Sequence, residues 1–265
     1  MKKLALFLAA FVAAALSASA QDWAKAILEK SPRHGEWVNV EHDNRKVNCF
    51  ITYPEVKEKA TAVLVIHEIF GMSDWVRVVT DELAAAGYIA IAPDLLSGLG
   101  KDGGGTDALG GADGARKVIG SLPPDQITAD LNAVASYVTK LPAANGKLAV
   151  VGFCWGGGQC FRFATNNHDI KAACVFYGTP PATPDLAKIT APVYGFYAGN
   201  DARIGATVPK TVEDMKAAGK PYEPVTYDGA GHGFMRAGET PGADEANKKA
   251  REESWVRLKD LLKKI

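Results

Sequence analysis

The chain contains 265 residues, of which 47% are hydrophobic and 23% charged. This length and composition suit one globular α/β domain with a substantial core and require no second domain. The 30 basic residues balance the 30 acidic ones, so nothing in the charge indicates nucleic acid or an anionic membrane as a partner.

The N-terminus has the features of an export signal. Residues 1–20 open with two lysines, continue with an apolar run from Leu4 to Leu16, and end in the small-residue site Ala18-Ser19-Ala20. The apolar run is too short to span a bilayer comfortably. We therefore expect a cleaved signal at 1–20 and a single mature domain over 21–265, exported in soluble form to the periplasm or secreted; an uncleaved anchor is the alternative.

The first half of the mature chain alternates strands and helices. Two polar-alternating runs on either side of Asp43-Asn44 indicate an antiparallel pair. Wholly apolar runs indicate strands buried on both faces of a sheet. A helix begins at Ser73 or Asp74 and ends before Gly87. The expected elements are a helix at 22–30, strands at 37–41, 46–53, 62–66 and 88–92, and a helix at 73–86.

A glycine-rich stretch follows between Leu95 and Leu122. It is too long for an ordinary connection, and we expect a mobile lid there. Its triple glycine, Gly103-Gly104-Gly105, is not a phosphate loop, because no Lys-Ser or Lys-Thr follows at the required place.

The second half continues the alternation. Pro123-Pro124-Asp125 begins a helix whose apolar residues share one face. Strands are expected at 148–151, 172–177, 193–198 and 223–227, with helices at 206–218 and 243–262. Regular alternation predicts an α/β fold with a doubly wound, mostly parallel sheet and antiparallel N-terminal strands.

The strand at 148–151 stops at Gly152-Phe153-Cys154-Trp155-Gly156. This is G-x-C-x-G, the nucleophile-elbow pattern with a thiol in place of the usual hydroxyl. A nucleophile on such a sharp turn leaves no room for side chains two residues to either side, so glycine is required there. The alternative interpretation is a glycine-rich turn that contains a buried structural cysteine.

The other three cysteines are Cys49, Cys160 and Cys174. We interpret them as buried free thiols, because cysteine is among the most buried residue types. If Cys154 stays free, one disulfide among these three is the alternative. No zinc-ligand spacing or C-x-x-C occurs in the sequence, and we expect no metal or cofactor.

Four titratable residues follow buried strands: Glu68, Cys154, Asp201 and His232. The carboxyl ends of parallel strands meet at one edge of a sheet, where functional groups collect. The order nucleophile, acid, histidine matches the α/β-hydrolase arrangement, so we predict an α/β-hydrolase fold. For His67, beside Glu68, we favour a structural hydrogen-bonding role over that of a second base.

The chain resembles the dienelactone hydrolase (carboxymethylenebutenolidase) family. The motifs that carry the resemblance are H-E-I-F-G at Glu68, G-F-C-W-G-G at Cys154, G-N-D at Asp201 and G-A-G-H-G-F-M-R at His232. The resemblance implies a triad of cysteine, histidine and aspartate. It also implies that Glu68 contacts the resting thiol and helps to generate the thiolate once substrate binds.

The resemblance further implies that Arg236 grips a substrate carboxylate, a role that suits its planar guanidinium. The family's second carboxylate-binding arginine lies in the segment that corresponds to 95–122. Arg116 is the arginine that this sequence offers there.

The expected chemistry is acyl transfer from a lactone or activated ester. Cys154 would attack the carbonyl, His232 would shuttle protons, and Asp201 would fix the histidine tautomer. The backbone amides of Trp155 and Ile69 would form the oxyanion hole. A non-catalytic carboxylate-binding protein and a thiol-redox protein are the alternatives.

Overall fold

The structure, a computed structural model, describes residues 22–265, so the predicted export signal lies outside the described residues. Residues 22–30 are helical, as expected. The strands are β1 (Gly35–His42), β2 (Arg45–Thr52), β3 (Ala60–Ile66), β4 (Ile89–Pro93), β5 (Ala144–Phe153), β6 (Ala172–Phe176), β7 (Val193–Ala198) and β8 (Tyr222–Tyr227).

The α-helices are α2 (Asp74–Ala85), α3 (Ala112–Val118), α4 (Pro124–Thr139), α5 (Trp155–Phe163), α6 (Thr183–Leu186), α7 (Ala202–Gly205), α8 (Val208–Ala217), α9 (Phe234–Ala237) and α10 (Glu245–Leu262). The 3₁₀ helices are η1 (Lys101–Gly103), η2 (Asp107–Leu109) and η3 (Ile119–Ser121).

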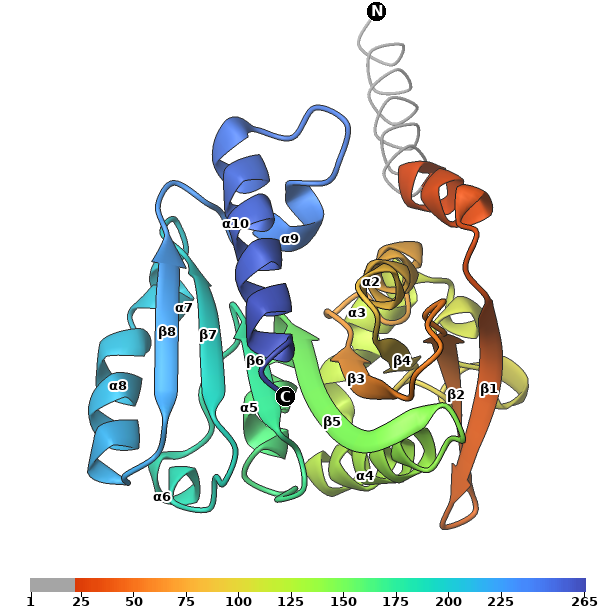
Figure 1. Cartoon of the computed structure of the whole chain (residues 1–265), viewed down its shortest axis with the longest axis horizontal. Coiled ribbons are helices and arrows are strands. Elements are labelled where there is room, and N and C mark those ends of the chain that lie inside the picture. Colours follow the sequence, from red (N-terminus) through yellow and green to blue (C-terminus); the bar gives the residue numbers. More distant parts are fainter. Residues whose placement is uncertain (1–21) are drawn as a thin grey trace, which may run out of the picture.

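The eight strands of residues 22–265 join one sheet in the order β1-β2-β4-β3-β5-β6-β7-β8 (Figure 1). The first two strands form the predicted antiparallel pair, whose turn residues Asp43 and Asn44 both adopt positive φ, 44° and 59°. Strand β2 also runs antiparallel to β4, and the remaining neighbours pair in parallel. The structure thus has the α/β-hydrolase fold that the sequence predicted.

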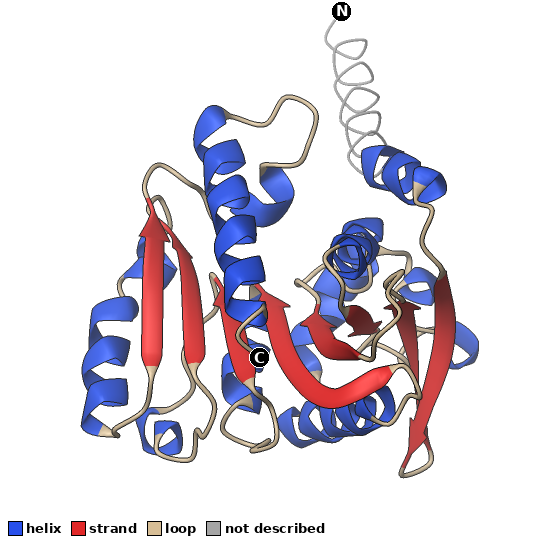
Figure 2. Ribbon diagram, viewed as in Figure 1, coloured by secondary structure: helices blue, strands red, loops and turns tan. Residues whose placement is uncertain are grey.

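Helices cover both faces of the sheet (Figure 2). On one face, buried side chains of α4 and α5 pack on the sheet; on the other face, those of α2 and α10 do so. The central strands β3, β4 and β6, and β5 from Leu148 onward, are therefore covered on both sides, which is why their sequences are almost continuously apolar.

The glycine-rich stretch, where we predicted a mobile lid, contains η1, η2, α3 and η3. Its anchor is the buried Asp94 carboxylate, which accepts hydrogen bonds from the Thr106 amide at 2.7 Å and the Thr106 hydroxyl at 2.9 Å. The same hydroxyl accepts a bond from the Met72 amide at 2.9 Å. The stretch is thereby tied to the loop that follows β3.

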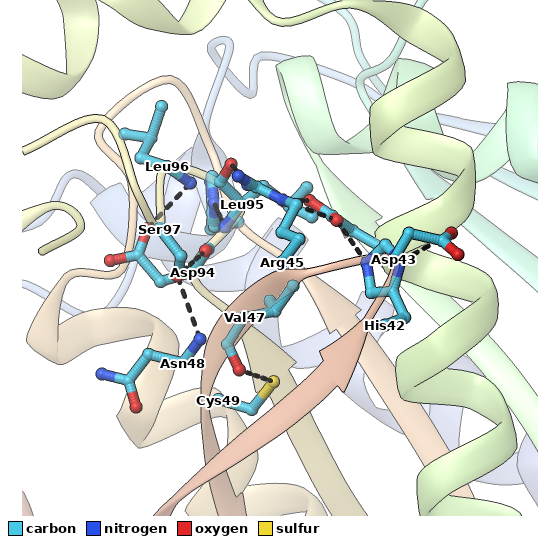
Figure 3. A network of polar contacts seen from close by, with 12 residues as sticks. His42, Asp43, Arg45, Val47, Asn48, Cys49, Asp94, Leu95, Leu96 and Ser97 are labelled. Atoms are coloured by element: carbon cyan, nitrogen blue, oxygen red, sulfur yellow. Dashed lines mark hydrogen bonds and ion pairs between the residues drawn. The ribbon is translucent and has the colours of Figure 1, made fainter. Parts of the chain in front are cut away.

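A second polar network fixes the chain where this stretch begins (Figure 3). Asp130 of α4 is fully buried and accepts hydrogen bonds from the side chains of His42 at 2.7 Å and Arg45 at 2.8 Å. The Arg45 guanidinium also donates to the Leu95 carbonyl at 3.3 Å. The hairpin of β1 and β2 is thus joined to α4 and to the end of β4.

Within residues 22–265, every helix is too short or too polar to cross a membrane.

Candidate active site

The nucleophile elbow lies between β5 and α5. Cys154 connects them with φ 56° and ψ −118°, in the region that L-residues rarely occupy. A Cβ on Gly152 would lie 2.1 Å from the Gly156 carbonyl oxygen, and one on Gly156 would lie 2.3 Å from the His67 carbonyl oxygen. The predicted need for glycine at both positions is confirmed.

Three side chains from separate loops meet at this elbow. The His232 Nε2 atom lies 3.1 Å from the Cys154 Sγ atom, and the His232 Nδ1 atom lies 2.5 Å from Asp201 Oδ2. Asp201 caps α7 after β7 and is only 8% exposed, and His232 follows β8. A carboxylate only accepts hydrogen bonds, so Nδ1 carries the proton in this pair.

Electrostatics around His232 favour its charged form. The hydrogen bond to Cys154, followed by that to Asp201, raises the pKa of His232 to about 9 against the opposing effect of burial. The Cys154 sulfur lies 3.1 Å from Nε2, so His232 is placed to exchange a proton with it. The arrangement therefore supports nucleophilic attack by sulfur.

The two backbone amides predicted to form an oxyanion hole are both without a backbone acceptor in the described chain. The Trp155 amide belongs to the first residue of α5, so it has no acceptor within the helix. The Ile69 amide lies in the loop after β3, and it too has no acceptor among residues 22–265. Both amides therefore retain a free donor.

Glu68 does not form the contact with the thiol that the family resemblance implied. Within the described chain its carboxylate has one side-chain partner, the Arg236 Nε atom, at 2.8 Å from Oε2. Glu68 is 2% exposed, and burial raises the pKa of its carboxyl group although Arg236 opposes this shift. A cation lies within hydrogen-bond distance, and a buried carboxylate bonds to it in preference to the thiol.

Arg116 and Arg236 both lie within 6 Å of the Phe70 ring. The Arg236 Cζ atom is 4.9 Å from the ring centroid, and the Arg116 Cζ atom is 5.9 Å from it. Apart from Arg236 Nε, neither guanidinium makes a hydrogen bond within the part of the chain that the structure describes. Both retain donors that could hold a carboxylate.

Sequence reasoning missed Tyr177, which follows β6. Its backbone adopts φ 39°, and its fully buried ring packs edge-on against His232 at a centroid distance of 5.1 Å. It also missed α9, the single turn that carries Arg236. A non-glycine residue at positive φ has no signature in sequence, and a four-residue helix is too short to show periodicity.

The remaining cysteines are free thiols, as interpreted from the sequence. Cys49, Cys160 and Cys174 are all buried, and burial raises the pKa of Cys174 to about 12. The Cys160 thiol contacts the Val150 carbonyl at 3.5 Å, and it forms no disulfide with Cys154. Residues 22–265 contain no cluster of three potential metal ligands.

Comparison with known proteins gives a consistent result. A family model described as "Dienelactone hydrolase family" matches residues 47–265. Relatives from Salmonella typhi and Escherichia coli K12, both named "Putative carboxymethylenebutenolidase", are 34% identical over 207 residues and 32% identical over 212 residues. These matches cover 74% and 76% of this chain, and the same shares of the relatives.

The fold is also similar to that of a solved structure. A "Putative Dienelactone Hydrolase" from Klebsiella pneumoniae superposes with a TM-score of 0.75 at 25% identity, covering 88% of this chain and 99% of that one.

Proposed function

The chain belongs to the dienelactone hydrolase family and is a hydrolase, and from that premise we propose that it cleaves lactones or activated esters through an acyl-thiol intermediate on Cys154. The observation that carries this proposal is the continuous hydrogen-bond chain from Cys154 Sγ through His232 to Asp201, with distances of 3.1 and 2.5 Å. That geometry is what an activated sulfur nucleophile requires.

The proposed reaction has two halves. The Cys154 thiolate attacks the substrate carbonyl carbon, and the Trp155 and Ile69 amides stabilise the oxyanion. The intermediate collapses, the carbon–oxygen bond to the leaving group breaks, and the His232 imidazolium protonates the leaving oxygen. Neutral His232 then takes a proton from water, which attacks the thioester and releases a carboxylic acid and the Cys154 thiolate. A lactone would leave as one hydroxy acid.

The substrate we propose is an ester or lactone that carries a carboxylate, of the carboxymethylenebutenolide type. Arg236 and Arg116 would bind that carboxylate, because their free donors lie around the same Phe70 ring. A substrate carboxylate would also compete with Glu68 for Arg236. Glu68 would then become more basic beside the site and could help to remove the thiol proton.

The decisive experiment compares the wild type with Cys154→Ala on lactones and nitrophenyl esters. We expect turnover by the wild type and none by the variant, with unchanged secondary structure by circular dichroism. Turnover by Cys154→Ala at the wild-type rate would refute the proposed nucleophile. A wild type that binds such carboxylates without hydrolysing them would instead support the non-catalytic alternative.

We also propose that the protein is exported, from the signal features of residues 1–20. Mass spectrometry of protein from the periplasmic fraction would test this proposal, with an N-terminus near Gln21 expected. An intact Met1 on protein confined to the cytoplasm would contradict it.

A further inference from the structure

His67 is a fully buried imidazole beside the active site that takes no part in the triad. Its Nδ1 atom lies 2.8 Å from the Glu68 carbonyl oxygen, and its Nε2 atom lies 3.3 Å from the Leu95 amide nitrogen. A carbonyl only accepts and an amide only donates, so the proton is on Nδ1 and the ring is neutral. Burial lowers the pKa of His67 and so maintains this neutral form.

The Glu68 carbonyl, which accepts the Nδ1 proton of His67, belongs to the same peptide group as the Ile69 amide. In a trans peptide the carbonyl and the N–H point in opposite directions. The Glu68 carbonyl also accepts a bond from the Gly71 amide at 3.2 Å, so two donors fix its direction. The Ile69 N–H is consequently directed away from His67, and it has no acceptor among residues 22–265.

His67 also contacts Trp155, the residue whose amide is the second predicted donor. Its ring stacks on the Trp155 ring, with 5.7 Å between centroids and 15° between planes. Its carbonyl oxygen faces the elbow so closely that only glycine fits at position 156. One residue therefore lies against the elements that supply both oxyanion donors.

The far side of the imidazole is anchored as well. Leu95, whose amide donates to Nε2, is held through its own carbonyl by Arg45 (Figure 3). Buried Asp130 in turn fixes the Arg45 guanidinium. The ring orientation is thus set by bonds to two separate segments, rather than by packing alone. A side chain held in this way can define the direction of a neighbouring peptide.

From these contacts we propose that His67 is a positioning residue that holds the Glu68–Ile69 peptide with its N–H directed at the developing oxyanion. The inference rests on the proposed function, because it assumes that Ile69 supplies such a donor. The bond to the Glu68 carbonyl would also polarise that peptide and strengthen its N–H as a donor.

Two substitutions separate this role from simple packing. His67→Phe keeps a ring against Trp155 but removes both hydrogen bonds. His67→Asn places an amide nitrogen near the position of Nδ1, so it can restore the bond to the Glu68 carbonyl without that to Leu95. His34→Phe is the control, since the His34 ring likewise stacks on an aromatic ring, that of Tyr53, but precedes the edge strand β1 and takes no part in the bonds that anchor His67.

The measurements are kcat and KM for an ester and for its thiono analogue, together with the rate of Cys154 alkylation by iodoacetamide. We expect His67→Phe to lower kcat for the ester by about 10- to 100-fold, since the complete loss of one oxyanion donor costs roughly 100- to 1000-fold. KM and the alkylation rate should stay near wild type, because neither depends on the oxyanion. Sulfur accepts hydrogen bonds weakly, so the advantage of the ester over its thiono analogue should shrink.

We expect His67→Asn to recover most of the lost kcat, and His34→Phe to retain wild-type kcat. Wild-type kcat and an unchanged thiono ratio in folded His67→Phe would overturn the inference while leaving the proposed function intact. Folded His67→Asn that is as impaired as His67→Phe would overturn it as well. A wild type that hydrolyses no ester would remove the proposed function, and this inference with it.

Discussion

Arg236→Met tests whether the site selects substrates that carry a carboxylate. The Arg236 guanidinium gives Nε to Glu68 at 2.8 Å, and its other donors are unoccupied within the described chain. Two of these could bind a carboxylate in parallel. Two hydrogen bonds to a charged group contribute about 3 to 6 kcal/mol at full strength. Because the side chain is 36% exposed, we take half of that free energy, about 1.5 to 3 kcal/mol in total.

That free energy corresponds to a loss of about 10- to 100-fold in kcat/KM, since 1.36 kcal/mol is tenfold. The loss should occur for an ester that carries a carboxylate and should be small for its neutral, amide-capped analogue. The assay is the ratio of the two kcat/KM values in wild type and variant. An equal loss for both substrates would refute the assignment of Arg236 to the carboxylate.

The same substitution leaves Glu68 buried without its cation, which itself costs about 3–5 kcal/mol of folding free energy. The test therefore needs Glu68→Gln and the double variant. In the Glu68→Gln background, we expect Arg236→Met to be much less destabilising in urea unfolding, because no charge is left unpaired. If the losses in unfolding free energy of Glu68→Gln and Arg236→Met added fully in the double variant, that result would contradict an interaction between the two side chains.

Three further predictions concern the elbow, the triad and a remote carboxylate. Gly156→Ala should lower the free energy of unfolding by about 1–3 kcal/mol in urea titration, since its Cβ would meet backbone oxygen atoms at 2.3 and 2.4 Å; unchanged stability would contradict this. Asp201→Asn should lower kcat by about 10⁴-fold by favouring the wrong tautomer of His232; a loss below tenfold would argue against the triad. The pKa of Glu239 is raised from 4.5 to about 7, first by burial and second by the charge of Glu82. Between these pH values the folded state binds more protons than the unfolded state, so wild-type stability falls as pH rises. Glu239→Gln should therefore gain stability relative to wild type between pH 5 and pH 8, and a constant difference would contradict the shift.

The sequence predicted the elements that local physical chemistry determines. The apolar strands were recognisable because they are buried on both faces, and the elbow because steric crowding requires glycine at 152 and 156. The positions of Cys154, Asp201 and His232 followed from the rule that parallel strands end at one edge. Each of these features is specified by hydrophobic periodicity, by a required glycine or by the topology of the sheet.

Pairing between distant segments could not be predicted in the same way. The sequence contains no signal that Glu68 would bind Arg236, 168 residues away, in preference to the nearby thiol. The bond between Arg45 and Asp130 likewise joins positions 85 residues apart. Such partners depend on the angles at which strands and helices pack, and periodicity does not specify these angles.

Backbone strain at the elbow depends both on local geometry and on bonds between distant segments. Cys154 and Tyr177 follow the paired strands β5 and β6, and both adopt positive φ without being glycine. Each such residue costs about 1–3 kcal/mol unless its surroundings compensate. Here the Cys154 amide bonds to the Phe176 carbonyl at 3.0 Å, and the Tyr177 amide bonds to the Phe196 carbonyl at 2.8 Å. The buried sheet thus holds both strained residues in place, so that the thiol projects from the elbow toward the imidazole instead of turning back into the helix.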